Sequence, residues 1–104
     1  MVPLTAAARS GRLVADYDAD ADVLYLSLGQ AVPSDSEDDP TGIVLRWSIQ
    51  SGEPTGATVV GYRGYSWPQR LPDLIAIIGR HLRVTEKEAK LVIEAATRPP
   101  RLIR

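Results

Sequence analysis

Four aspartates near the start of the chain have the residue type and spacing that could do chemistry. They occupy every second position of the stretch DYDADAD, as Asp16, Asp18, Asp20 and Asp22. Because close carboxylates gain from sharing a divalent cation, a loose Mg²⁺ or Ca²⁺ site built from Asp18, Asp20 and Asp22 is one hypothesis. The alternative is a turn, since aspartate side chains readily accept bonds from nearby backbone N–H groups.

A calcium loop of the EF-hand type does not fit these aspartates. Such a loop needs oxygen ligands at positions 1, 3 and 5, glycine at position 6 and glutamate at position 12. Counted from Asp16, positions 6 and 12 are Ala21 and Ser27, and counted from Asp18, position 6 is Val23. We therefore predict a solvated hairpin end at the aspartates, with no metal and no other cofactor.

The remaining catalytic residue types are scarce. The chain has no cysteine and one histidine, His81, which excludes thiol nucleophiles and metal sites built on two histidines. The sequence lacks a Walker loop, a dinucleotide-binding glycine pattern and a G-x-S-x-G motif. His81 lies near the end of a predicted helix, where capping or an ordinary surface position is expected. We predict that the protein is not an enzyme and has no small-molecule ligand.

An aromatic and basic stretch is the main candidate for partner binding. Arginines alternate with rings between positions 62 and 70, and arginine and aromatic side chains together dominate many binding hot spots and also stack on single-stranded nucleic acid. The alternative is that one or two of the rings seal the sheet against the first helix. The predicted contact residues are Tyr62, Arg63, Tyr65, Trp67 and Arg70.

The charges are unevenly distributed along the chain. Residues 16–39 contain eight acids and no Lys or Arg, whereas residues 80–104 contain seven basic residues and three acids. An acidic half suits a basic partner, although the two halves can also neutralise each other within one domain. The second acidic run, SDSEDDP, is either a solvated loop or an electrostatic rim formed by Asp35, Glu37, Asp38 and Asp39.

Hydrophobic periodicity predicts an α+β fold. Alternation of apolar and polar residues indicates strands, and apolar residues spaced three or four apart indicate helices, the second with a capping box from Thr85 to Glu88. All strands precede both helices, so we expect a four-stranded antiparallel β-meander followed by two C-terminal α-helices packed on one face. The expected strands are 12–17, 22–28, 43–49 and 57–65, and the expected helices are 70–82 and 86–96.

The length of 104 residues suits one domain, which we place at 12–98. Residues 1–11 are expected to be a flexible lead-in, 29–42 a loop and 99–104 a basic tail. The sequence lacks an apolar run of about 20 residues and the basic start and apolar core of a signal peptide. We therefore predict a cytoplasmic protein that does not bind membranes.

The second predicted helix, with the basic residues after it, superficially resembles part of a helix-turn-helix motif. A recognition helix presents polar or basic residues to base edges. This one offers Lys87 and Lys90, but also Glu86, Glu88 and Glu94, which phosphates would repel. We expect no nucleic-acid binding, with weak binding through the basic C-terminal helices kept as an alternative.

Three motifs resemble the DUF2283 family of small bacterial proteins, over residues 16–66. A Tyr-Asp turn leads into an Asp-x-Leu-Tyr strand, and two further strand motifs follow. The matching residues are Tyr17, Asp18, Asp22, Leu24 and Tyr25, then Gly42, Ile43 and Val44, then Val59, Val60 and Gly61. The resemblance implies a strand meander followed by a helix, and a partner role toward small ribonuclease-like toxins.

Taken together, the sequence predicts a small non-enzymatic domain that binds another protein, itself or both. An open sheet with helices on one side leaves a face and two edges to be covered, and self-association is a common way to cover them. An antitoxin-like role is implied by the family resemblance, and a divalent-metal-binding domain is an alternative function.

Overall fold

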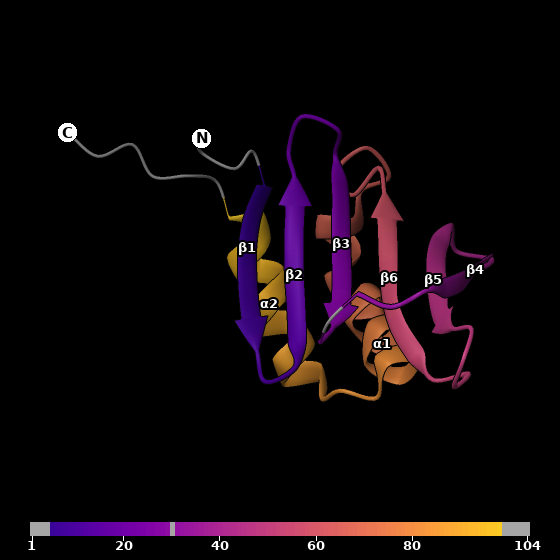
Figure 1. Cartoon of the computed structure of the whole chain (residues 1–104). Helices are drawn as coiled ribbons and strands as arrows, with labels where there is room; N and C mark the ends of the chain where they lie inside the picture. Colours follow the sequence, from indigo (N-terminus) through magenta and orange to yellow (C-terminus); the bar gives the residue numbers. More distant parts are fainter. Residues whose placement is uncertain (1–4, 30, 99–104) are drawn as a thin grey trace.

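In the computed structural model, which describes residues 5–29 and 31–98, the chain forms one antiparallel sheet and two C-terminal helices (Figure 1). This confirms the α+β prediction. The strands are β1 (Thr5–Ser10), β2 (Leu13–Asp18), β3 (Val23–Leu28), β4 (Ser34–Asp38), β5 (Ile43–Ser48) and β6 (Pro54–Val60). They are followed by a short 3₁₀ helix, η1 (Trp67–Arg70), and by α1 (Leu71–Leu82) and α2 (Glu86–Thr97).

The strand order β1-β2-β3-β6-β5-β4 corrects the predicted four-stranded meander. The first three strands form one meander and the last three form another, and the two units meet where β3 pairs with β6. After β3 the chain therefore passes over β6 and β5 to start β4 at the far edge of the sheet, as Figure 1 shows.

Two strands lie where the sequence predicts none. β1 occupies part of the expected lead-in and pairs with β2, and β4 occupies part of the expected 29–42 loop and pairs with β5. β4 is the acidic sequence SDSED, whose side chains are mostly exposed, so the backbone ladder rather than burial holds this edge strand. The predicted tail, 99–104, lies outside the described residues.

Both helices pack on the same face of the sheet, as predicted. α2 lies against β1 and β2, and α1 lies against β6. The core between the layers is mainly aliphatic, because most inward positions of the strands are aliphatic and meet the aliphatic stripes of the helices. The largest of its fully buried side chains are Leu13, Leu24, Ile43 and Val59 from the sheet and Leu74, Ile78, Val92 and Ile93 from the helices.

The helix ends follow the expected capping chemistry. The Thr85 hydroxyl accepts the backbone N–H of Glu88 at 3.1 Å, which confirms the hydroxyl half of the capping box, and it donates to the Glu88 carboxylate at 3.2 Å. α1 ends at Arg83, whose left-handed conformation reverses the chain toward α2. Neither helix among the described residues is long and apolar enough to cross a membrane.

Candidate functional site

The face of the sheet opposite the helices is uncovered over most of its area, and we call it the open face. On β2, Leu13, Ala15 and Tyr17 point into the core, so the alternate residues Val14 and Asp16 point to the open face. The same alternation adds further open-face residues, strand by strand: Asp18 on β2, Val23, Tyr25 and Ser27 on β3, Thr58 and Val60 on β6, Val44 and Arg46 on β5, and Asp38 on β4.

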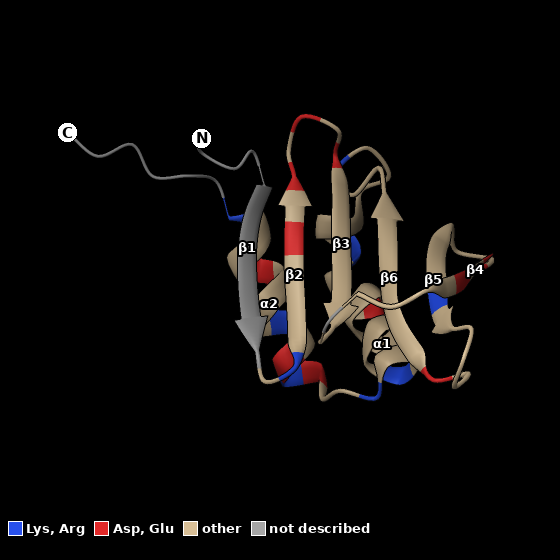
Figure 2. Cartoon of the chain, viewed as in Figure 1, with Lys and Arg blue, Asp and Glu red and all other residues tan. Residues whose placement is uncertain are grey.

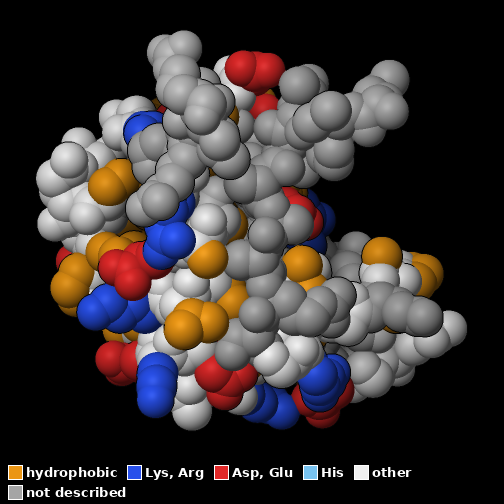
Figure 3. Space-filling model, turned by 90° about the vertical axis from the view of Figure 1, so that its left-hand side faces the viewer, with side chains coloured by type: hydrophobic (Ala, Val, Ile, Leu, Met, Phe, Trp, Pro, Cys, Tyr) orange, Lys and Arg blue, Asp and Glu red, His pale blue; other side chains and the backbone are white. Residues whose placement is uncertain are grey.

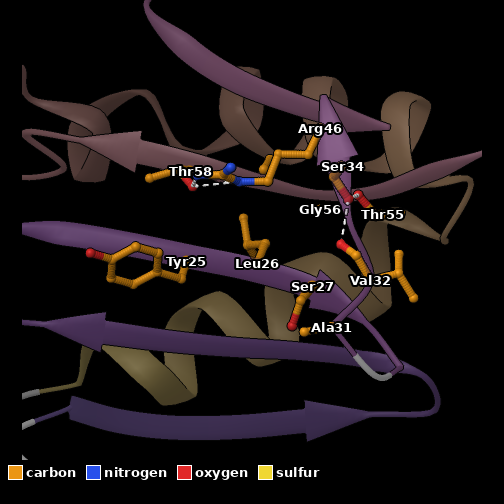
Figure 4. Close-up of a pocket in the computed structure, with 11 residues that line it drawn as sticks. Tyr25, Leu26, Ser27, Ala31, Val32, Ser34, Arg46, Thr55, Gly56 and Thr58 are labelled. Atoms are coloured by element: carbon orange, nitrogen blue, oxygen red, sulfur yellow. Dashed lines mark hydrogen bonds between the residues drawn. The ribbon is translucent and has the colours of Figure 1, made fainter. Parts of the chain in front are cut away.

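The connection between β3 and β4 turns part of the open face into a groove of about 320 Å³, which we call the Arg46 groove (Figure 4). Its floor is formed by residues 25–27 of β3 and 55–58 of β6. Arg46 of β5 and residues 31–34 of the connection, except Pro33, complete its lining. The Ser34 hydroxyl donates to the Val32 carbonyl within the connection and is hydrogen-bonded to the Thr55 hydroxyl of β6, each at 2.9 Å. The Pro33 carbonyl accepts the backbone N–H of Ile49 at 3.1 Å, which ties the connection to the end of β5.

Arg46 supplies the positive charge of the groove. Figure 4 shows its side chain reaching from β5 toward Thr58 on β6, where the guanidinium donates from Nε at 3.3 Å and from Nη2 at 3.0 Å to the Thr58 hydroxyl. Within the described part of the chain, one ion pair is found, between Arg83 and Glu53. No carboxylate in that part of the chain pairs with Arg46. The guanidinium is therefore oriented but not neutralised.

The opposite side of the sheet supports the groove through His81 of α1. Its Nε2 lies 3.1 Å from the carbonyl oxygens of both Arg46 and Gly56, and its ring meets Trp47 edge-on at 4.8 Å. Both partners are acceptors, so Nε2 is the donor. The pairing register between β5 and β6 shifts beside Arg46, and this irregularity leaves the carbonyls of Arg46 and Gly56 available to the imidazole. His81 is thus a structural residue below the sheet, neither a cap nor an ordinary surface residue.

Of the four aspartates near the start of the chain, Asp16 lies within β2, and Asp18, Asp20 and Asp22 lie at the turn between β2 and β3. Asp18 accepts the backbone N–H groups of Asp20 and Ala21 at 3.1 and 3.2 Å, which confirms the predicted turn-capping role. No group of three or more metal-ligating side chains converges anywhere in residues 5–29 or 31–98. Figure 2 shows acidic residues at the β2–β3 turn and one further acidic segment within β2.

Asp22 has a further role that the sequence does not reveal. Its carboxylate accepts the backbone N–H groups of Arg63 at 2.8 Å and Gly64 at 2.9 Å, and the hydroxyl of Tyr17 at 2.7 Å. Partial burial opposes ionisation, but the hydrogen bonds from Arg63, Tyr17 and Gly64 outweigh it and hold the pKa of Asp22 below its usual value. Asp22 thus ties the β2–β3 hairpin to the turn after β6.

Two of the five predicted contact residues, Tyr62 and Trp67, are internal, which corrects the prediction for these two. Tyr62 is 3% exposed and Trp67 is 2% exposed, so both rings belong to the core. Tyr62 packs edge-on against Tyr17 at 5.5 Å. The chain reverses at Gly61, whose φ is +71°, and this turn carries the following rings back under the sheet. The alternative that the rings seal the core is confirmed for Tyr62 and Trp67.

The two arginines of the same stretch also make internal contacts. Arg63 donates to the Tyr17 hydroxyl at 3.1 Å and to the Thr97 carbonyl at 3.0 Å, which joins the turn to the end of α2. Arg70 lies 4.0 Å over the Trp67 ring and donates to the Tyr65 carbonyl. The side chains of Arg63, Tyr65 and Arg70 are nevertheless exposed, that of Tyr65 to 70%, so these three remain available as contacts.

The second acidic run lies on the edge strand β4 and the turn after it. Asp35, Glu37 and Asp38 are exposed, and Asp39 accepts the amide and hydroxyl of Thr41. Those two bonds lower the pKa of Asp39. The run is therefore a strand and a capped turn rather than the predicted loop, and its role as a rim for a partner stays a prediction.

Comparisons with known proteins add no relative: no protein-family model, no curated protein and no solved structure matches the chain. The resemblance to the DUF2283 family therefore stays a prediction, and so do the functions that it implies.

Proposed function

We propose that this chain is a non-enzymatic protein-binding domain and that its partner covers the open face of the sheet. The observation that carries the proposal is an apolar centre on that face. Val23 of β3 lies directly opposite Val60 of β6, and Tyr25 is the next open-face residue along β3. Tyr25 is 43% exposed and Val60 is 51% exposed, so neither is covered by the rest of the chain.

Carboxylates flank this apolar centre on both sides. Asp16 lies opposite Tyr25 and Asp18 lies opposite Val23 on β2, and Asp38 lies on β4 at the other side of the face. Charged groups around an apolar centre select partners of complementary charge and speed their encounter. The pattern favours a protein surface with apolar residues between lysines and arginines. A basic ribonuclease toxin, the partner that the family resemblance implies, has this chemistry.

The side of the molecule that carries α2 offers a second surface. Figure 3 shows this side, where the coloured hydrophobic side chains lie among charged ones. Leu91 of α2 is 54% exposed, and single exposed leucines of this kind are normal on soluble proteins. The open face therefore remains the best candidate for a protein contact.

Site-specific photo-crosslinking tests the proposal. A photoreactive phenylalanine analogue is placed at Tyr25, and a matched control carries it at Leu91, in the cells that naturally make the protein. We expect a cross-link to a basic protein from position 25 only. When the two purified proteins are mixed, Tyr25→Ala should weaken the affinity between them about tenfold. Added salt should weaken it further.

Two outcomes would contradict the proposed partner. Equal cross-linking from positions 25 and 91 would mean that the open face is not specific. A cross-link between two copies of the chain, with a dimer in sedimentation that Tyr25→Ala dissociates, would replace the basic partner with self-association, the other prediction from the sequence.

A further inference from the structure

We infer that the Arg46 groove is a binding site for a small organic anion, in which Arg46 holds a carboxylate or phosphate group. This goes beyond the proposed protein contact and does not depend on it. It also differs from the expectation that the chain has no small-molecule ligand. The groove is formed by three strands and a crossing connection that are distant in sequence, so no local motif marks it.

The first step is the state of the Arg46 guanidinium. A guanidinium has five N–H donors in a planar fork that matches two oxygens of a carboxylate or phosphate. Thr58 receives one bond from Nε and one from Nη2, and these fix the plane of the fork. Three donors are left over, and no hydrogen bond joins them to another residue in the described part of the chain. They are thus oriented in advance for an external oxyanion.

The second step is the shape of the groove beside that charge. A volume of about 320 Å³ lies at the lower end of the range of natural ligand sites. Gly56 lies in the floor between Ser27 and Arg46, its neighbours in the sheet, and the absence of a Cβ there lets the β3 backbone approach closely. The site therefore has room for a compact ligand body next to the anionic group.

The third step is the chemistry of the walls. Tyr25 and Val32 are each partly exposed, at 43% and 44%, and give the groove apolar surface for a ring or a short hydrocarbon. The hydroxyls of Ser27 and Thr55 add polar groups at the side of β3 and β6. This combination of an oriented cation, hydroxyls and an apolar wall fits an aromatic or short aliphatic carboxylate or phosphate ester.

The test uses the full chain, ¹⁵N-labelled, and four probes at constant ionic strength: benzoate, phenyl phosphate, inorganic phosphate and benzamide. Benzamide matches benzoate in shape but has no charge. We expect saturable amide shifts at residues 25–27, 31–32 and 55–58 with benzoate or phenyl phosphate, at least tenfold weaker binding of benzamide, and loss of binding in Arg46→Gln. The control Arg80→Gln, on the exposed side of α1, should bind as the unchanged protein does.

The relative affinities of the probes distinguish the source of the anion. Tighter binding of phenyl phosphate than benzoate points to a phosphate ester, and the reverse points to a carboxylate. If Arg46→Gln does not fold, Arg46→Lys decides: it keeps the charge but loses the fork, so at least threefold weaker binding is expected. Equal binding of benzamide and benzoate, unaltered binding by the Arg46 variant, or no saturable shift at 20 mM probe (about the weakest useful affinity) would overturn the inference.

Discussion

Replacing Asp22 by Asn tests whether the aspartates of the hairpin act as structure or as chemistry. Asp22 has a left-handed φ of +57°, a conformation that asparagine tolerates as well as aspartate does. The exchange therefore keeps backbone and size and alters only the charge and one acceptor. In the folded chain the Asp22 carboxylate accepts hydrogen bonds from the Tyr17 hydroxyl and from the backbone amides of Arg63 and Gly64.

The expected cost is about 1–3 kcal/mol in the free energy of unfolding. The amide group of asparagine can accept on one atom only, so at least one of the three donors faces an NH₂ group and loses its partner. A hydrogen bond to a charged group contributes about 1.5–3 kcal/mol net. The expected cost begins at about 1 kcal/mol, below the usual value for such a bond, because the bonds from residues 63 and 64 to Asp22 are exposed to water.

Urea denaturation of the two proteins, with Asp20→Asn as the matched control, measures this cost. Asp20 is exposed and lies in the same turn, so its exchange should change the free energy of unfolding by less than about 0.5 kcal/mol. Equal stabilities of the Asp22 and Asp20 variants at pH 7 would refute the structural role of Asp22.

The same pair of proteins has a predicted pH dependence. Because hydrogen bonds lower the pKa of Asp22 in the folded chain, its stabilising contribution is complete above the unfolded value, about 4, and is lost as the pH falls through the folded value. The difference between the unchanged protein and Asp22→Asn should therefore shrink between pH 5 and pH 2. A constant difference over that range would contradict the assignment of the lowered pKa to Asp22.

Three further outcomes follow from the same contacts, each read by thermal or urea unfolding. Gly56→Ala should lower the free energy of unfolding by about 2 kcal/mol or more, because its Cβ would lie 2.4 Å from the carbonyl oxygen of Leu26. The control Gly52→Ala meets no atom and should cost only roughly 1 kcal/mol for its positive φ. Equal costs would contradict the clash. His81→Leu should cost about 1–3 kcal/mol, since two carbonyls lose their donor; a stabilised variant would show that water replaces the imidazole. Millimolar Mg²⁺ or Ca²⁺ should leave the unfolding temperature unchanged, because Asp18 and the other hairpin acids form no convergent metal site in the described chain; a saturable rise would revive the metal-binding alternative.

The fold was predictable where side-chain burial determines the strand. β2, β3 and β5 alternate apolar and polar residues, and the structure contains them within a residue or two of the predicted bounds. β1 and β4 are edge strands with small or acidic residues, and their pairing comes from backbone bonds that composition does not reveal. β6 was predicted to end at 65 but ends at 60, where Gly61 turns the chain.

The candidate site was predicted poorly for a different reason. Rings interleaved with arginines occur both at contact surfaces and at core boundaries, and only the turn at Gly61 decides that Tyr62 and Trp67 are buried. Arg46 and Thr58 are twelve residues apart and meet diagonally across β5 and β6, where the register pairs Arg46 with Gly56, so no local pattern predicts the oriented guanidinium. Sequence periodicity reports which face a residue occupies but not what lies across from it.

The groove itself follows from the order in which the strands join the sheet. From β3 to β4 the chain must cross two intervening strands, three strand spacings or about 14 Å, on the side that the helices leave free. Between Leu28 and Ser34 the chain can span at most about 20 Å, so a wide detour away from the sheet is not possible. The connection, fastened by Ser34 to Thr55, is held close to the sheet. The wall of the groove is therefore set by topology before any ligand arrives, and lengthening the connection with inserted glycines should weaken anion binding while leaving Arg46 and Thr58 in place.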